Sequence, residues 1–468
     1  MKKCIKLIFL IALTLGIVVL CSRILLLKSE DGVSQLKSFY KQKNNTVDVL
    51  FLGSSHVYCD ISTGLLWDKY GMASYDLGGA EAPSWTSYYH LKEALKSQRP
   101  EVIFYEISIA AIRPTDYPPE FWVEDNNYGM KWNQNRVDSL KENTLDQTFP
   151  KIFFPLSAMH GRYSELTKDD FIDEHNSINY KGFDPREAVT PFETPDISKV
   201  TGKTECSEKA EKYLRKIIEL CKEEDIPLVF FVSPYVVSPQ EQEMFNYMFG
   251  IGEEYGVPYI DFNKCYDEMG LDFSCDMAEE LHLNYSGNSK FTEYIGKRIK
   301  EEYDIPDRRG NKDYTSWDVD ALNQRMERLD LQLQTAGTPR EAADAINKGL
   351  DNYVVFVSVG ENVDLSAVSE ENLAILHDLQ IDNESITSGT NICIQNGNTQ
   401  IIHSEDECKI TISNDNDRLL FTKRESTPEE PALSVLNMNG NEMVFDAGSI
   451  GIKVYDKVRL VYAGEMNM

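Results

Sequence analysis

The chain has 468 residues, of which 42% are hydrophobic and 11% aromatic, enough to form the cores of two or three ordinary domains. Its 27 glycines and 18 prolines are ordinary amounts and no short period recurs, so disordered, collagen-like and solenoid chains are poor fits. With 47 Lys and Arg against 76 Asp and Glu, the formal net charge is −29. This charge argues against nucleic acid as a partner, because binding a phosphate backbone requires clustered cations.

The N-terminus differs from this polar average. Between residues 7 and 27 the only charged side chain is Arg23, and a helix of that length is long enough to cross a bilayer. Because Lys2, Lys3 and Lys6 precede the apolar run, the short tail should stay in the cytoplasm. A cleaved signal peptide is the alternative, but the run is long and no typical cleavage site follows it. The sequence therefore predicts a single-pass anchor in the cell membrane, with the large domains outside the cytoplasm.

Short apolar runs alternate with amphipathic helical patterns through the first part of the chain. Continuous apolar strands between such helices indicate a parallel sheet that is covered on both faces. The sequence therefore predicts an α/β domain with strands at residues 47–52, 74–77, 102–107, 227–232 and 259–262.

These patterns divide the chain into segments. They are a transmembrane anchor (residues 1–28), a polar stalk (29–45), the α/β domain (46–304) with an aromatic-rich insert (113–200), a linker helix (305–337) and a smaller α+β domain (338–468). An insertion this long is typical of a lid, a partner surface or a substrate wall. A helical subdomain that buries its aromatic side chains on itself fits the insert equally well.

Two strand ends place small residues at one edge of the expected sheet. The first strand runs directly into Gly53, Ser54 and Ser55, at the carboxyl edge where open α/β sheets hold their active sites. The second strand ends in Gly78 and Gly79, and a glycine there lets a backbone N–H approach a reacting oxygen closely. Each feature alone is also typical of an ordinary loop.

A third segment, after the last expected strand, pairs a histidine with a carboxylate. Glu279 precedes His282 by three residues, so within one turn its carboxylate can reach one nitrogen of the imidazole ring. The other ring nitrogen is then left to face the sheet edge. This pattern indicates a general base that is oriented by an acid.

With these three segments, the sequence resembles the SGNH/GDSL hydrolase superfamily over about residues 45–303. The resemblance implies a three-layer α/β/α fold in which Ser55 is the nucleophile and His282 the general base. It places Glu279 in the position of the family's aspartate, and it implies an oxyanion site made by the backbone N–H groups of Ser55 and Gly78. No metal or nucleotide cofactor is expected.

The sequence departs from the family pattern in two places. Glutamate at position 279 replaces the family's aspartate, which leaves Asp276 as a rival partner for His282. The family's Gly-x-Asn-Asp block is absent, and residues 105–108 (Tyr-Glu-Ile-Ser) take its place. The usual asparagine donor to the oxyanion is therefore missing, and Ser108 is only a weak substitute for it.

Within the superfamily, the chain is more similar to membrane-anchored acyl-transfer members, such as the teichoic acid D-alanyl transfer protein and alginate acetylation proteins. These have one N-terminal helix, a Gly-Ser-Ser motif and a degenerate third block, and they act with a multi-spanning membrane-bound O-acyltransferase. The resemblance implies a cell-surface O-acyl esterase or acyltransferase that modifies polysaccharide, with such an acyltransferase as a partner. The alternative is a catalytically silent scaffold that binds glycan or recruits that partner.

The C-terminal domain resembles the interleukin-like EMT inducer type, through residues 352–359, 369–379 and 445–456. In glycan-processing enzymes, domains of this type are similar to carbohydrate-binding modules. The resemblance therefore implies glycan binding rather than a second catalytic centre.

Three further side chains have competing interpretations. Trp85 and Arg162 could line a glycan-binding cleft, because aromatic faces and guanidinium groups suit sugars, but core packing and a surface ion pair are favoured over that interpretation. His56 adjoins Ser55, yet consecutive residues at a strand end point in different directions. A structural hydrogen bond is therefore expected for His56 rather than a catalytic role.

Overall fold

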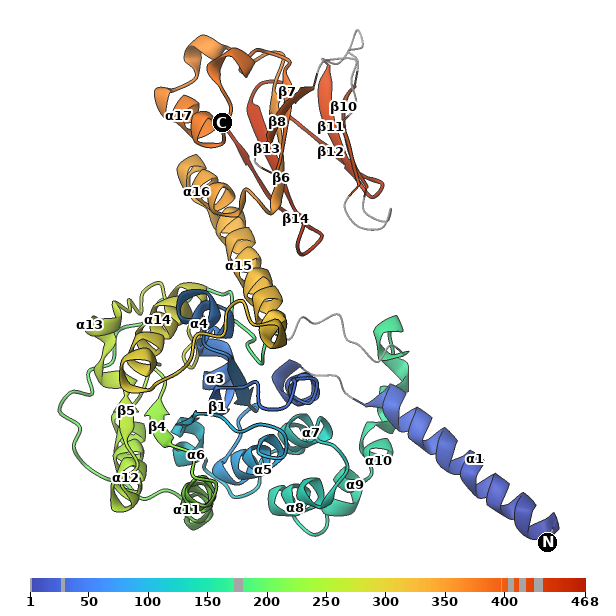
Figure 1. Cartoon of the computed structure of the whole chain (residues 1–468), viewed down its shortest axis with the longest axis vertical. Coiled ribbons are helices and arrows are strands. Elements are labelled where there is room, and N and C mark those ends of the chain that lie inside the picture. Colours follow the sequence, from blue (N-terminus) through green and yellow to red (C-terminus); the bar gives the residue numbers. More distant parts are fainter. Residues whose placement is uncertain are drawn as a thin grey trace. The chain divides into compact units, whose positions relative to one another are not determined.

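The computed structural model describes residues 2–26, 30–171, 180–396, 398–402, 408–411, 418–424 and 432–468 (Figure 1). The chain forms two compact units, Met1–Ala321 and Leu322–Met468. The division falls within helix α15 (Thr315–Thr335), whose Trp317 packs in the core of the first unit and whose Leu329 packs in a core of the second.

The first helix, α1 (Lys2–Leu25), is long and apolar enough to cross a membrane between Cys4 and Leu25. None of its most apolar window is buried within the protein, whereas Leu25 at its end is partly buried. Such a helix fits either a membrane anchor or a signal sequence.

The segment after α1 is folded into the first unit and is not a stalk. It forms η1 (Glu30–Ser34) and α2 (Gln35–Phe39), and the side chains of Val33, Leu36 and Phe39 are at most 1% exposed. Their spacing of three residues places them on one helical face, which packs into the protein. The prediction of a stalk over residues 29–45 is corrected accordingly.

The first unit is built on a five-stranded parallel sheet in the order β2-β1-β3-β4-β5. The predicted α/β fold class is confirmed. Strand order reverses between β1 and β3, which is where open α/β sheets form a crevice beyond the carboxyl ends of the strands. The strands are β1 (Val49–Gly53), β2 (Ser74–Gly78), β3 (Val102–Glu106), β4 (Leu228–Val232) and β5 (Tyr259–Asp261).

Helices cover both faces of this sheet, and Figure 1 shows α4 and α14 on one side of the strands and α5, α6 and α11 on the other. The central strands are therefore buried completely, which explains their continuous apolar runs. The helices are α3 (Ser55–Asp60), α4 (Thr63–Tyr70), α5 (Ser84–Ala94), α6 (Ser108–Ile112), α11 (Glu208–Glu223), α12 (Pro239–Tyr255), α13 (Tyr266–Met269) and α14 (Tyr285–Glu302).

The insert between β3 and β4 forms a helical subdomain around a small core that it shares with Val33 of η1. Its helices are α7 (Glu120–Tyr128), α8 (Gln134–Asn143), α9 (Phe149–Phe153) and α10 (Pro155–Met159). The core contains Val33, Val123, Tyr128, Leu140, Ile152 and Met159. Several of the insert's aromatic side chains lie outside this core and are exposed.

The second unit combines helices with two antiparallel sheets, as predicted for an α+β domain. Alternate residues of β6 face opposite ways: Val355 and Val357 pack against the helices, whereas Val354 and Phe356 pack against the second sheet. The sheet orders are β14-β13-β6-β7-β8 and β12-β11-β10-β9. The elements are α16 (Pro339–Gly349), α17 (Glu370–Asp378), β6 (Tyr353–Val359), β7 (Asn391–Gln395), β8 (Asn398–Ile402), β9 (Cys408–Thr411), β10 (Arg418–Arg424), β11 (Leu433–Met438), β12 (Asn441–Val444), β13 (Ile450–Asp456) and β14 (Val461–Asn467).

The end of β1 has no room for a side chain at Gly53. Its φ is +155°, and a Cβ there would lie 2.7 Å from the Cβ of Glu106 and 2.9 Å from a methyl group of Val57. We expect Gly53→Ala to lower the free energy of unfolding by about 2–4 kcal/mol, because overpacking adds to backbone strain. Gly256→Ala is the matched control, since Gly256 has a φ of +72° but nothing within 4 Å, and it should cost only about 1 kcal/mol. Equal shifts in thermal denaturation would contradict this account.

Candidate active site

The turn after β1 places Ser55 at the start of helix α3. Ser54 is the N-cap of this helix, and its hydroxyl oxygen accepts a hydrogen bond from the backbone N–H of His56. Gly78, paired with Gly53 in the sheet, lies against this turn so closely that a Cβ would be 2.4 Å from the carbonyl oxygen of Ser54. Two glycines therefore allow the ends of β1 and β2 to pack tightly around the serine.

Ser55, His282 and Glu279 form a continuous chain of hydrogen bonds. His282 Nε2 is 2.8 Å from Ser55 Oγ, and His282 Nδ1 is 2.6 Å from Glu279 Oε1. A carboxylate can only accept, so Nδ1 carries the proton and Nε2 accepts from the serine O–H. Ser55 and His282 are buried, whereas the Glu279 side chain is 59% exposed.

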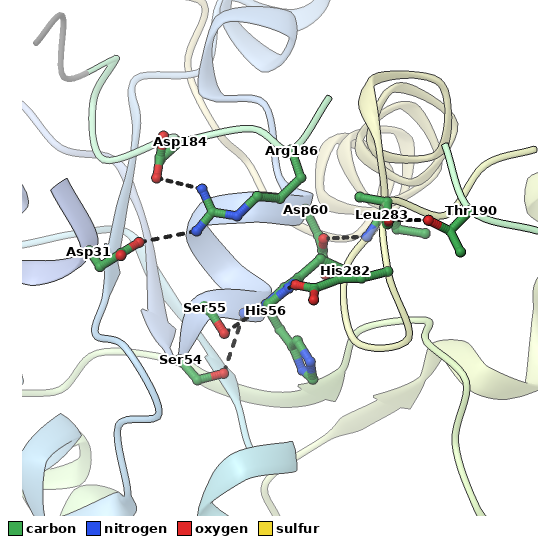
Figure 2. A network of polar contacts seen from close by, with 12 residues as sticks. Asp31, Ser54, Ser55, His56, Asp60, Asp184, Arg186, Thr190, His282 and Leu283 are labelled. Carbon is green, nitrogen blue, oxygen red and sulfur yellow. Dashed lines mark hydrogen bonds and ion pairs between the residues drawn. The ribbon is translucent and has the colours of Figure 1, made fainter. Parts of the chain in front are cut away.

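The loop that carries His282 is held by bonds on both sides of the histidine. The Leu283 N–H donates to Asp60 Oδ1 at 2.9 Å, and the hydroxyl of Thr190 donates to the carbonyl of Ala278 at 2.8 Å (Figure 2). Asn284 then caps α14 by accepting from two backbone N–H groups. The imidazole is thus positioned by α3, by the insert and by the start of α14.

No hydrogen bond or ion pair joins the side chains of Asp276 and His282. Asp276 is fully buried, and its Oδ2 accepts from the N–H of Asp272 at 2.7 Å and from the ammonium of Lys290 at 2.6 Å. The structure therefore brings Glu279, and not the rival Asp276, to the imidazole. Asp276 is engaged in fixing the loop and α14.

Ser108 is not placed as an oxyanion donor. Its N–H donates to Glu106 Oε1 at 3.1 Å, and its hydroxyl lies 2.7 Å from His56 Nδ1. Because both groups are occupied within the protein, the expectation that Ser108 replaces the family's asparagine is corrected. The remaining candidates for oxyanion donors are the backbone N–H groups of Ser55 and Gly78.

Behind the serine lies a buried polar cluster that was not predicted from the sequence. Glu106 Oε2 accepts from the Ser54 hydroxyl at 3.2 Å, and Glu106 Oε1 lies 3.6 Å from His56 Nδ1. His56 and Glu106 are at most 1% exposed, and the His56 ring lies 5.4 Å from the ring of His282. Burial lowers the pKa of His56, but the nearby Glu106 carboxylate outweighs it, so this pKa lies above its ordinary value. Glu106 stands at the end of β3, the neighbour of β1, and this position could have predicted that its carboxylate lies near the serine.

A second polar group joins three distant segments beside the site. Arg186, in the insert, is 2.9 Å from Asp184 Oδ2 and 3.1 Å from Asp31 Oδ1 in η1 (Figure 2). The hydroxyl of Tyr58, on α3, also donates to Asp31 at 3.2 Å. Sequence reasoning did not find this group, because its members share no motif and are up to 155 residues apart.

The surroundings keep His282 neutral. Its pKa is lowered from 6.5 to about 4, first by burial and then by the neighbouring His56 and Arg186, while Glu279 opposes these effects. A neutral imidazole next to a serine hydroxyl can act as a general base.

Neither of the two candidate glycan contacts lies in this site. Trp85 is fully buried, and its indole N–H donates to Asn143 Oδ1 at 2.8 Å, so the expectation that it lines a cleft is corrected. Arg162 is paired with Asp170 at 2.9 Å and donates to the carbonyl of Leu25 at 2.8 Å. Trp85 is therefore explained by core packing, and Arg162 by an ion pair.

Comparisons with known proteins add little to this geometry. No protein-family model matches the chain, and no curated protein matches it. Among solved structures, the chain is similar to an inferred acylhydrolase of Bacteroides fragilis NCTC 9343, with 10% identity and a TM-score of 0.28. The match covers 57% of this chain and 94% of that one.

We expect Glu279→Gln to lower ester turnover by at least about tenfold, because the imidazole loses the carboxylate that holds its tautomer. Asp276→Asn should change turnover per folded molecule by less than about twofold and act on stability instead, since Asp276 bonds to Lys290 and not to His282. Measurement of kcat and of the unfolding midpoint for both variants checks this ranking. A larger loss of turnover in Asp276→Asn would contradict it.

The pH dependence of turnover should reflect the lowered pKa of His282. Protonation removes the base, so kcat/KM should rise with pH through a midpoint near 4, below the ordinary 6.5. Arg186→Gln should move this midpoint to higher pH, because it removes a positive charge that opposes protonation of His282. Arg162→Gln, which alters a similar Asp-paired arginine elsewhere, should leave it unchanged. A midpoint at 6.5 or above in the unmodified protein would refute the assignment.

Proposed function

We propose that this protein is a serine O-acyl esterase or acyltransferase of the SGNH/GDSL type, which acts on acylated polysaccharide at the cell surface. The observation that carries the proposal is the hydrogen-bonded series Ser55–His282–Glu279 at the carboxyl edge of a parallel sheet. A serine, an imidazole and a carboxylate in this order support nucleophilic acyl transfer.

In the proposed mechanism, Ser55 Oγ attacks an ester carbonyl while its proton passes to His282 Nε2. Glu279 holds Nδ1–H and stabilises the imidazolium that forms. The N–H groups of Ser55 and Gly78 stabilise the oxyanion. The imidazolium then protonates the leaving alcohol, and an acyl-serine remains. Water releases the acyl group in an esterase, whereas a sugar hydroxyl accepts it in a transferase.

The surface location and the glycan substrate are further parts of the proposal. The apolar helix α1 supports membrane attachment, and the lysines before it support an outward-facing catalytic unit. A polysaccharide substrate, glycan binding by the second unit and a multi-spanning membrane-bound O-acyltransferase as partner come from the resemblance described above.

A catalytically silent scaffold is the second candidate. The observation in its favour is that Ser108, in the block where the family carries its asparagine, has both its N–H and its hydroxyl engaged with Glu106 and His56. Of the three expected oxyanion donors, only the backbone N–H groups of Ser55 and Gly78 then remain. In a scaffold, Ser55 would not react as a nucleophile.

Labelling with a fluorophosphonate separates the two candidates, because it modifies activated serines. We expect the folded protein to be labelled and Ser55→Ala to abolish both the label and turnover of a small aryl ester, by at least about 10³-fold. Ser54→Ala is the matched control, since Ser54 bonds to Glu106 and not to His282. Unlabelled folded protein would favour the scaffold, and an inactive Ser54→Ala with active Ser55→Ala would move the nucleophile.

The second unit should contribute to substrate capture rather than to chemistry. Removing residues 322–468 should leave kcat for a small soluble ester within about twofold, because tethering does not alter the acyl-transfer barrier. Turnover of acylated polymer should fall, and circular dichroism checks that the truncated chain remains folded. Loss of small-ester turnover in a folded truncation would show that the second unit completes the active site.

A further inference from the structure

The insert is attached directly to the end of the apolar helix α1. Leu25 and Leu26 pack against the insert's small core, and the guanidinium of Arg162 donates to the carbonyl of Leu25 at 2.8 Å. Figure 1 shows α10 beside the C-terminal end of α1, in agreement with these contacts. No spacer therefore separates the membrane-length helix from this part of the insert.

The same part of the insert carries large apolar side chains that the protein does not cover. Phe154 is 61%, Tyr163 74% and Phe171 64% exposed, and all three lie in or next to elements that contact α1. Trp132 is 56% exposed and extends this surface through ring contacts with Phe153, which itself contacts Phe154. We call Trp132, Phe154, Tyr163 and Phe171 the aromatic face.

We propose that the aromatic face lies in the headgroup region of the bilayer that α1 enters. The last turn of a helix of membrane-spanning length lies at the membrane–water interface, and segments packed on that turn share its depth. Trp and Tyr are enriched at this depth, and interfacial segments bury Phe there as well. Exposure of several such side chains together is unusual for a surface that faces water. The proposal requires that α1 remains attached, but it does not require the acyl-transfer chemistry.

This placement also brings the candidate active site close to the membrane. Asp31 follows Leu26 by five residues, so the chain between them can span at most about 18 Å. Asp31 bonds to Arg186 and to Tyr58, and Tyr58 lies on the short helix that begins with Ser55. If the proposed chemistry holds, the ester that reaches Ser55 is one presented near the lipid headgroups.

Tryptophan fluorescence in vesicles tests the proposal on the full chain. Trp67, Trp85 and Trp317 are buried in the core of the first unit, so Trp122→Phe with Trp132→Phe leaves a constant background. Single reporters are then introduced as Phe154→Trp and Tyr163→Trp, with Tyr259→Trp as the matched control on β5, where Tyr259 is 43% exposed. The vesicles contain phosphatidylcholine and phosphatidylglycerol, with or without bromine on the upper acyl chain.

We expect brominated lipid to reduce the added emission at positions 154 and 163 by at least about twofold and to leave that at position 259 unchanged. Equal quenching at the three positions, or none at 154 and 163, would overturn the proposal. Chains that fail to float with the vesicles would also overturn it, because α1 would then not be a retained anchor. Small-ester turnover of Phe154→Ser and Tyr163→Ser in detergent reports on the proposed function separately, and it should equal that of the unmodified protein.

Discussion

The hydrogen bond between Ser55 and His282 joins residues 227 positions apart, and the proposed chemistry depends on it. It exists because a parallel sheet brings the carboxyl ends of its strands to one edge, where the turn after β1 meets the loop before α14. Gly53 and Gly78 make the approach possible, since a side chain at either position would collide with the turn or with β3. The site is therefore a consequence of sheet register and of two missing side chains.

The electrostatic arrangement around the imidazole is unequal on its two sides. On the protein side lie the buried pair His56 and Glu106, together with Arg186, and burial and positive charge both lower the pKa of His282. On the solvent side lies Glu279, which is largely exposed and whose charge is therefore screened by water. The carboxylate thus orients the ring, while burial, His56 and Arg186 lower the pKa of the ring.

The segment between the apolar helix and the first strand has two roles. Its apolar side chains complete the core around β2, and its Asp31 reaches the polar group beside the active site. The insert similarly provides both Arg186 near the serine and the contacts with α1. The segment after α1 and the insert, which look like connections in the sequence, therefore contribute to the candidate active site and to the contact with α1.

Local patterns in the sequence determined the fold class of this protein and one contact of its candidate site. The α/β class, and the sequence of strands and helices along the chain, were predicted from five apolar runs with amphipathic helices between them, because burial on both faces requires continuous apolar strands. The long N-terminal apolar helix was predicted as well. The three-residue spacing of Glu279 and His282 also predicted that they can meet, since both lie in one loop. The tertiary structure decided what depends on long-range packing. It turned Ser108 toward His56, placed Glu106 behind the serine, buried Trp85, folded the supposed stalk into the core and assembled Arg186 with Asp31. No local pattern records these contacts, because each depends on which distant segment fills the space beside a side chain.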